Sequence, residues 1–183
     1  MLIACLGWGS LIWDPRELPF RGEWFADGPL LPIEFARQSR DGRVTLVLLD
    51  KAPVVRSLWA LMSVSSLQAA IEALAGREGI ADAEMTQYVG CWSIDQKSSG
   101  LSVDEIAKWT SRTGVEAVIW TALPATFDDE FGPGLVDDVL DYLRPLSHEK
   151  RQNAERYIRK APRQVDTDVR RRIEREFGWL PID

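Results

Sequence analysis

The first residues of the chain contain its most restrictive pattern, an apolar run over residues 2–6 that ends at Gly7-Trp8-Gly9-Ser10. Apolar character then resumes at Leu11-Ile12-Trp13. A short continuous apolar run that stops at turn residues is typical of a buried β-strand. Glycines after such a strand let the backbone approach a ligand closely, and the N–H groups of the turn can hold an anion or a polarised carbonyl. Two interpretations follow: a ligand-binding loop, or a strand that ends in an ordinary tight turn.

Strand patterns continue through the first half of the chain and predict a β-rich core. A turn over residues 14–18 follows the first strand, and residues 20–26 are either irregular or a short strand. Asp41-Gly42 between two apolar runs predicts a β-hairpin. Pro53 separates the second of these runs from the next strand. The other predicted strands cover residues 30–38, 43–49, 55–64, 88–95 and 115–123.

Helical periodicity begins at Ser65, which with Gln68 has the pattern of a capping box, and Gly76 is expected to end this helix. Ser102 with Glu105 predicts a second capped helix. Three further helical patterns follow a loop over residues 126–134. They cover residues 135–143, 147–160 and 168–177.

These patterns predict an α+β chain that folds as a single domain over residues 1–183. Residues 1–124 are expected to form a β-rich core, a mixed sheet or barrel with flanking helices, and residues 125–183 a helical C-terminal extension. Eight tryptophans are more than this length requires, so we expect several to line a pocket or an apolar seam. Trp109, Trp120 and Trp179 are candidate anchors for a homodimer interface.

Charge and composition bear on the partners and the location. A net charge of −6 argues against a nucleic-acid partner, which would need a clustered basic face. Arg170-Arg171-Arg172 alternates with acidic residues, a pattern typical of a solvated helix face. No window reaches the roughly 18 apolar residues of a membrane span, and the first residues do not resemble a signal peptide, so we expect a cytoplasmic protein without a membrane partner.

Several familiar chemistries are poorly supported. Gly7-Trp8-Gly9 begins like a dinucleotide fingerprint, but its third glycine is missing and no βαβ pattern follows. Cys5 and Cys91 form no CxxC pair, and His148 is the sole histidine, at an apparent helix start, although a Ser10–His148 or Cys–His pair stays open. The acidic groups 128–130 and 137–138 are typical of solvated loops. We therefore expect no metal and no cofactor.

Glu78 is the strongest candidate for acid–base chemistry. It lies between Gly76 and Gly79, after a predicted helix and before an apolar strand, so the backbone can bend and leave room beside the carboxylate. Partial burial would raise the pKa of this carboxyl and allow it to act as a general base near neutral pH. The alternative is that Arg77 and Glu78 are turn residues that face water.

Two motifs resemble those of the gamma-glutamylcyclotransferase-like superfamily, in its ChaC-type branch. Leu6-Gly-Trp-Gly-Ser-Leu-Ile-Trp13 is similar to the family's N-terminal signature, usually Tyr-Gly-Ser followed by Leu or Asn. Arg77-Glu78-Gly79 is similar to its Glu-Gly element after a short helix. The resemblance covers about residues 1–123. Trp8 stands where the family usually has tyrosine, and the helical extension has no counterpart in it.

The resemblance implies an enzyme, a transferase or lyase of the type used in glutathione metabolism, that releases 5-oxoproline from a small gamma-glutamyl amine or peptide. It implies that Glu78 is the catalytic acid/base, and that Gly7, Trp8, Gly9, Ser10 and Leu11 bind the gamma-glutamyl group. Arg37, for a carboxylate, and Tyr88, for a hydrogen bond, are further candidate substrate-binding residues. Two alternatives stay open: a non-catalytic binding module on the same fold, or a related amide-cleaving acyltransferase.

Overall fold

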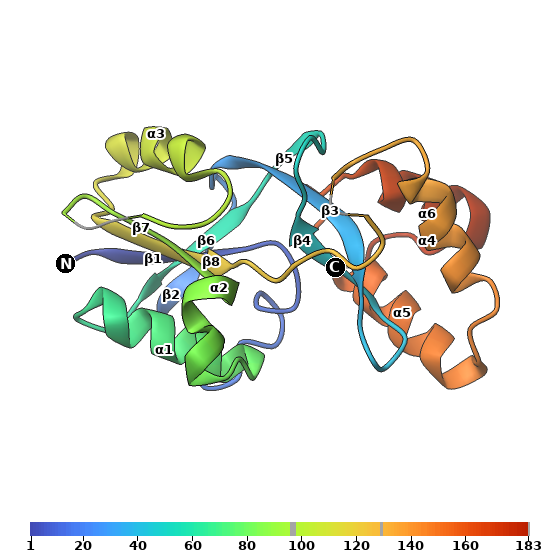
Figure 1. Cartoon of the computed structure of the whole chain (residues 1–183), viewed down its shortest axis with the longest axis horizontal. Helices are drawn as coiled ribbons and strands as arrows, with labels where there is room; N and C mark the ends of the chain where they lie inside the picture. The colour runs from blue at the N-terminus through green and yellow to red at the C-terminus, as the bar shows by residue number, and fades with distance from the viewer. Residues whose placement is uncertain (96–97, 129, 183) are drawn as a thin grey trace. The chain divides into compact units, whose positions relative to one another are not determined.

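The computed structural model describes residues 1–95, 98–128 and 130–182, and this part of the chain contains eight strands and six α-helices (Figure 1). The strands are β1 (Ile3–Gly7), β2 (Phe20–Phe25), β3 (Leu30–Gln38), β4 (Val44–Leu48), β5 (Val54–Arg56), β6 (Leu58–Met62), β7 (Val89–Ser93) and β8 (Ala117–Thr121). The helices are α1 (Leu67–Glu78), α2 (Met85–Tyr88), α3 (Val103–Thr113), α4 (Leu135–Leu143), α5 (His148–Lys160) and α6 (Asp168–Phe177), with a 3-10 turn η1 (Asp82–Glu84) before α2. The predicted α+β class is confirmed.

The strands form two open sheets. The larger has the order β2-β6-β1-β8-β7, in which β1 runs parallel to β8 and antiparallel to β6. The smaller has the order β4-β3-β5. Among the described strands β2 and β7 stay at opposite edges of the larger sheet, so the barrel form of the prediction is wrong and the sheet form holds.

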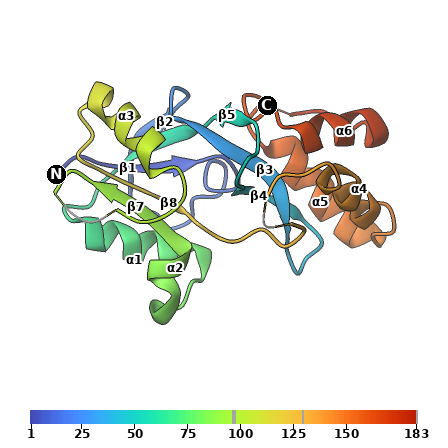
Figure 2. The ribbon, with the colours of Figure 1, turned by 45° about the horizontal axis from the view of Figure 1, so that its top comes forward.

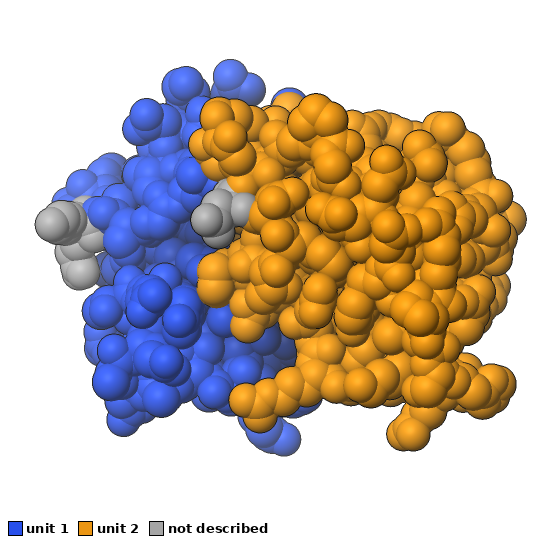
Figure 3. Space-filling model, turned by 45° about the vertical axis from the view of Figure 1, so that its right-hand side comes forward, with its two compact units in different colours: residues 1–7, 14–31, 56–123 blue, residues 8–13, 32–55, 124–183 orange. Residues whose placement is uncertain are grey.

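The chain divides into two compact units, coloured separately in Figure 3. Unit 1 comprises residues 1–7, 14–31 and 56–123. Unit 2 comprises residues 8–13, 32–55 and 124–183. The helical extension therefore belongs to one unit with the β3–β4 hairpin and residues 8–13. The single-domain organisation stays a prediction.

Unit 1 is built on the five-stranded sheet, and every residue of its central strand β1 is buried. Helices α1 and α2 cover one face of this sheet and α3 lies on the other (Figures 1 and 2). Trp120 of β8 has no exposed surface and lies opposite Gly90 of β7. A Cβ atom at Gly90 would lie well inside 3.0 Å of the Trp120 indole, so the absence of a side chain there makes room for the ring.

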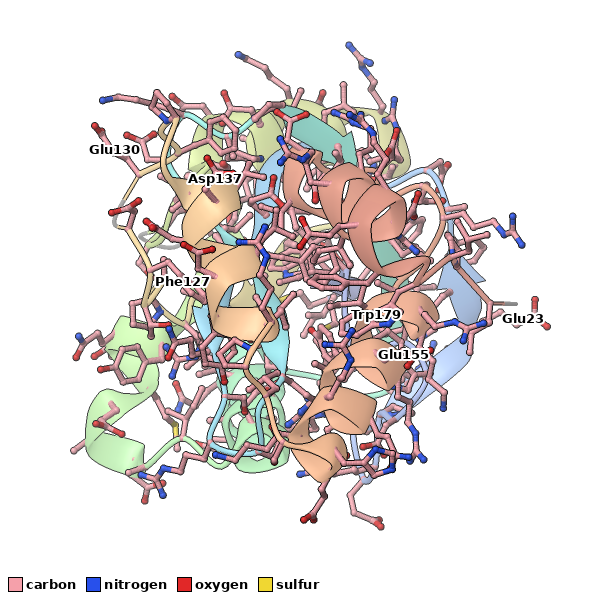
Figure 4. All side chains as sticks on the ribbon, turned by 90° about the vertical axis from the view of Figure 1, so that its right-hand side faces the viewer. Glu23, Phe127, Glu130, Asp137, Glu155 and Trp179 are labelled. Carbon is pink, nitrogen blue, oxygen red and sulfur yellow. The ribbon has the colours of Figure 1, made fainter. Side chains whose placement is uncertain are left out.

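Unit 2 packs the C-terminal helices around the β3–β4 hairpin. The hairpin turns at Gly42, whose φ of 91° suits glycine, and the predicted Asp41-Gly42 turn is confirmed. Helix α5 packs against β4, and α4 against α6. Trp179, labelled in Figure 4, stacks on Phe177 with ring centroids 4.9 Å apart, and the guanidinium of Arg151 lies 5.2 Å from the Trp179 ring.

The predicted strand over residues 55–64 is interrupted at Ser57. The backbone N–H and the hydroxyl of Ser57 both donate to the Pro29 carbonyl, at 3.1 and 2.8 Å. The residues before Ser57 join the smaller sheet as β5, and those after it join the larger sheet as β6. Apolar periodicity could not reveal this change of sheet, because both halves are strands.

The ends of two helices also differ from the prediction. Ser66, not Ser65, caps α1, because its hydroxyl accepts the Ala69 N–H at 3.2 Å. Helix α1 continues through Gly76 to Glu78 and is capped by Gly79, whose φ of 70° is left-handed. Ser102 precedes α3 but its side chain makes no capping bond.

Two expectations about exposed residues are wrong. Trp109, Trp120 and Trp179 are 9%, 0% and 4% exposed, so they are core residues and not interface anchors. Arg170 is 1% exposed, so the basic cluster on α6 is not wholly a solvated face. A homodimer stays a prediction. Among the helices that the structure describes, none has both the length and the apolar character needed to cross a membrane.

Candidate functional site

Glu78 is the last residue of α1, and its side chain is 15% exposed. Its Oε1 lies 2.6 Å from Nη1 of Arg77, whose side chain is 5% exposed. The alternative that both residues face water is therefore wrong. The expected position of Glu78 in a bend between two glycines is also wrong, because Gly76 is helical and only Gly79 turns the chain.

Arg77 links the end of α1 to the segment that follows residue 13. Its Nη2 donates to the carbonyl of Asp14 at 2.7 Å, and Nη1 of Arg16 donates to the Arg77 carbonyl at 3.1 Å. These bonds lie within unit 1. Unit 1 resumes at Asp14 after the turn of residues 8–13. The two bonds hold this part of the chain against the end of the helix that bears Glu78.

Cys5 of β1 lies near the same ion pair. The thiol is completely buried, and Sγ lies 3.6 Å from the Leu6 carbonyl. Burial is the main reason that the pKa of the Cys5 thiol is raised, and the Glu78 carboxylate raises it further. Cys5 is therefore a neutral thiol, unsuited to nucleophilic catalysis.

Residues 8–13 form a compact turn in unit 2. The Ile12 N–H donates to the Gly9 carbonyl at 3.0 Å. Trp8, Gly9 and Leu11 are buried, whereas Ser10 is partly exposed. Gly7, the last residue of β1, is buried in unit 1.

Trp8 is a core residue of unit 2. It is 3% exposed, and its indole N–H donates to the Leu46 carbonyl at 3.3 Å. Trp8 lacks the hydroxyl of the family's usual tyrosine, but its indole N–H supplies a polar contact of its own. The indole ring is therefore part of the core packing of unit 2, whereas Ser10, Ile12 and Trp13 of the turn are partly exposed.

Arg37 and Tyr88, the other predicted substrate-binding residues, lie in different units. In unit 2, Nη1 of Arg37 donates to the Pro124 carbonyl at 2.7 Å. In unit 1, Tyr88 ends α2 and its carbonyl accepts the Ala122 N–H at 2.8 Å. Their predicted roles stay predictions.

The remaining candidates have structural surroundings. His148 is exposed at the start of α5, with Nε2 2.9 Å from the side-chain nitrogen of Gln152. Glu130 pairs with Lys51. Asp129 lies outside the described residues. No three His, Cys, Asp or Glu side chains of the described ranges are grouped so that they could hold a metal ion.

A shallow hollow on α6 of unit 2 contains none of the predicted site residues. Its lining consists of Arg171, Glu174, Arg175 and Leu180.

No protein-family model matches the chain, and no curated protein matches it. The predicted acid/base Glu78 is largely buried beside Arg77, at the end of a helix that packs on the sheet of unit 1.

Sequence reasoning missed three residues with notable buried surroundings. Arg77 is given no role of its own by the sequence, neither as a turn residue nor in the Arg77-Glu78-Gly79 motif, although its place beside Glu78 at the end of a helix was a usable signal. Tyr157 of α5, which contacts the turn of residues 8–13, carried no signal, because nothing in the local pattern of α5 relates it to Gly9. Glu34 of β3 is fully buried and was missed as one polar residue in an apolar strand.

Proposed function

We propose that this protein is a gamma-glutamylcyclotransferase-like enzyme that acts in the cytoplasm on a small gamma-glutamyl amine or peptide and releases 5-oxoproline. The observation that carries the proposal is the ion pair of Glu78 and Arg77 at the C-terminal end of α1. A carboxylate only 15% exposed, held at 2.6 Å by a guanidinium, has the restricted position that a catalytic acid/base requires. The motif that resembles the family's Glu-Gly element supports the same assignment.

The reaction is an intramolecular aminolysis. Glu78 accepts a proton from the substrate's α-ammonium group, and the freed amine attacks the carbonyl carbon of the γ-amide. The new C–N bond closes the five-membered ring as the carbonyl oxygen becomes an oxyanion. The carbon–nitrogen bond to the leaving amine then breaks as Glu78 returns its proton to that amine. The ring nitrogen loses its second proton through Glu78 to the same amine, which departs as an ammonium ion, and 5-oxoproline is left with a neutral lactam N–H.

The resemblance, and not the placement of the two units, implies that the turn after β1 binds the gamma-glutamyl group. The backbone N–H groups of Gly9, Ser10 and Leu11 would stabilise the oxyanion, and a well-placed donor of this kind contributes about 3 kcal/mol. Trp8 supports the turn from the core of unit 2.

Arg77 has a positioning role in this mechanism. Because its Nη1 binds Oε1 of Glu78, we assign proton transfer to the other oxygen, Oε2. Arg37 can bind the substrate carboxylate with guanidinium N–H groups other than the one directed at Pro124, since a guanidinium has five donors. Tyr88 would supply a hydroxyl hydrogen bond.

The test is Glu78→Gln, with Glu72→Gln as the matched control on the exposed part of the same helix. The parent protein is incubated with gamma-glutamyl amines, gamma-glutamyl dipeptides and glutathione, and 5-oxoproline is measured by chromatography. We expect turnover of at least one substrate, its loss in Glu78→Gln and its retention in Glu72→Gln, with both variants folded by circular dichroism. Unchanged turnover in Glu78→Gln would overturn the assignment.

The binding-module alternative has one observation in its favour, because an arginine beside the carboxylate can be a purely structural partner. Calorimetry separates the two functions. Binding of a gamma-glutamyl compound without 5-oxoproline release by the parent would establish the module and exclude the enzyme.

A further inference from the structure

Tyr157 of α5 lies in the core of unit 2, 6% exposed, with aromatic neighbours on two sides. Its ring meets Trp13 edge to face with centroids 5.4 Å apart, and Phe35 of β3 at 6.4 Å. The guanidinium of Arg43 lies 5.5 Å from the ring centroid. These contacts fix the plane of the ring and therefore the direction of its hydroxyl.

The hydroxyl points to the backbone of Gly9. A Cβ atom built at Gly9 would lie well inside 3.0 Å of Oη and 3.4 Å from Cζ of Tyr157. Gly9 does not have the left-handed backbone that other residues avoid. The need for glycine at this position therefore comes from the tyrosine hydroxyl and not from backbone strain.

Leu46 of β4 joins the same hydroxyl to the start of the turn. Its N–H donates to Oη of Tyr157 at 3.4 Å, and its carbonyl accepts the indole N–H of Trp8 at 3.3 Å. The turn is thus held at Trp8 by Leu46, at Gly9 by the close approach of Oη, and at Trp13 by ring contact. All these residues belong to unit 2.

We propose that Tyr157 is the positioning residue of the turn formed by residues 8–13, so that a helix of the C-terminal extension sets the geometry of the N–H groups that bind the substrate. This inference rests on the proposed function for its catalytic consequence. It gives the extension, which the resemblance does not cover, a role in the reaction.

The first experiment measures the turn without reference to activity. Tyr157→Phe keeps the ring and removes Oη, and Tyr142→Phe on α4 is the matched control. Amide hydrogen exchange is followed by NMR at Ile12, whose N–H closes the turn, and at Ile80, whose N–H donates to Ala75 in unit 1. We expect exchange roughly three- to tenfold faster at Ile12 in Tyr157→Phe, from the usual worth of one hydrogen bond, and no change at Ile80 or in Tyr142→Phe.

The second experiment adds a methyl group at Gly9 and then removes the Tyr157 hydroxyl that this methyl group would meet. Gly9→Ala places Cβ against Oη, whereas the double variant Gly9→Ala/Tyr157→Phe leaves Cζ at 3.4 Å as the nearest ring atom. Gly132→Ala is the control, because no atom lies within 4 Å of its added Cβ. We expect Gly9→Ala to lower kcat with little change in KM, since oxyanion donors act in the transition state. The kcat of the double variant should be at least about fivefold higher than that of Gly9→Ala, a coupling usual for residues in contact.

The outcomes separate the inference from the proposed function. Unchanged exchange at Ile12 in Tyr157→Phe, or a double variant no better than Gly9→Ala, overturns the positioning role. A fall in kcat that follows only the unfolded fraction of each variant also overturns it. If the parent releases no 5-oxoproline, the proposed function fails, and the exchange measurement alone decides whether Tyr157 positions the turn.

Discussion

Arg77 Nη1 lies 2.6 Å from Glu78 Oε1, although the two residues are consecutive on helix α1. Neighbouring residues on a helix point about 100° apart and do not normally face each other. They meet here because they end the helix, where both side chains are largely buried and Arg77 also donates to Asp14. The pair is thus built by the packing of the helix end.

The first prediction concerns this pair. Arg77→Met leaves the Glu78 carboxylate without its counter-ion in a largely buried place, and we expect the free energy of unfolding to fall by about 3 kcal/mol. The double variant Arg77→Met/Glu78→Gln should be more stable than Arg77→Met alone. Urea denaturation measures both, with the exposed Arg112→Met of α3 as control. A double variant less stable than Arg77→Met would contradict the ion-pair explanation.

The second prediction concerns pH. Glu34 accepts the N–H groups of Phe35 and Val169 at 2.8 and 3.3 Å. Burial is the main reason that the pKa of its carboxyl is raised to about 7, and the charge of Asp168 raises it further. The hydrogen bonds of the carboxylate, including one with Thr167, act in the opposite direction and lower the pKa. Between the ordinary pKa of a glutamate and about 7, the folded protein holds a proton that the unfolded chain releases.

The contribution of Glu34 to stability is therefore greatest at low pH and is lost as the pH rises to about 7, by up to about 3 kcal/mol. We expect Glu34→Gln to flatten the dependence of unfolding free energy on pH between about 5 and 7. Urea titrations at several pH values test this, with Glu23→Gln, on the exposed strand β2, as control. An identical pH profile for parent and Glu34→Gln would exclude this titration.

The third prediction compares two glycines of α1. Gly76 is helical with no atom within 4 Å of an added Cβ, so Gly76→Ala should stabilise the protein by about 0.5–1 kcal/mol. Gly79 has a left-handed backbone, so Gly79→Ala should destabilise it by about 1 kcal/mol. Thermal unfolding measures both. Destabilisation by Gly76→Ala would instead support the expected helix end at that residue.

The fourth prediction concerns Arg170, whose guanidinium donates to the carbonyls of Ala161, Pro162 and Val165 at 2.6–3.0 Å and to Glu174 at 3.2 Å. Lysine cannot reproduce this planar set of donors, so Arg170→Lys should lower the unfolding free energy by about 2–3 kcal/mol. Arg172→Lys, at an exposed position of the same helix, should change it by less than about 0.5 kcal/mol. Equal effects in guanidinium chloride denaturation would show that these bonds contribute little.

Local patterns were sufficient for much of the secondary structure. The structure confirms the predicted bounds of β3, α4 and α6, because their apolar periodicity stops where turn residues or prolines begin. Local patterns failed at the end of α1, where Gly76 was taken as a stop. Glycine inside a helix weakens it without ending it. Here α1 packs on β7 and β8 and continues two residues past this glycine, to Glu78, before Gly79 caps it.

For the candidate site, the sequence by itself determined which residues are chemically suited to the predicted roles: Glu78 to acid–base chemistry and the Gly7–Gly9 region to a turn after a buried strand. Only the tertiary structure decided that Glu78 is paired with Arg77, that Trp8 belongs to the core, and that Gly9 makes room for Tyr157. Periodicity reports which side of an element is buried, whereas these relationships depend on contacts between residues far apart in the chain. Such contacts follow from packing, which a local pattern does not encode.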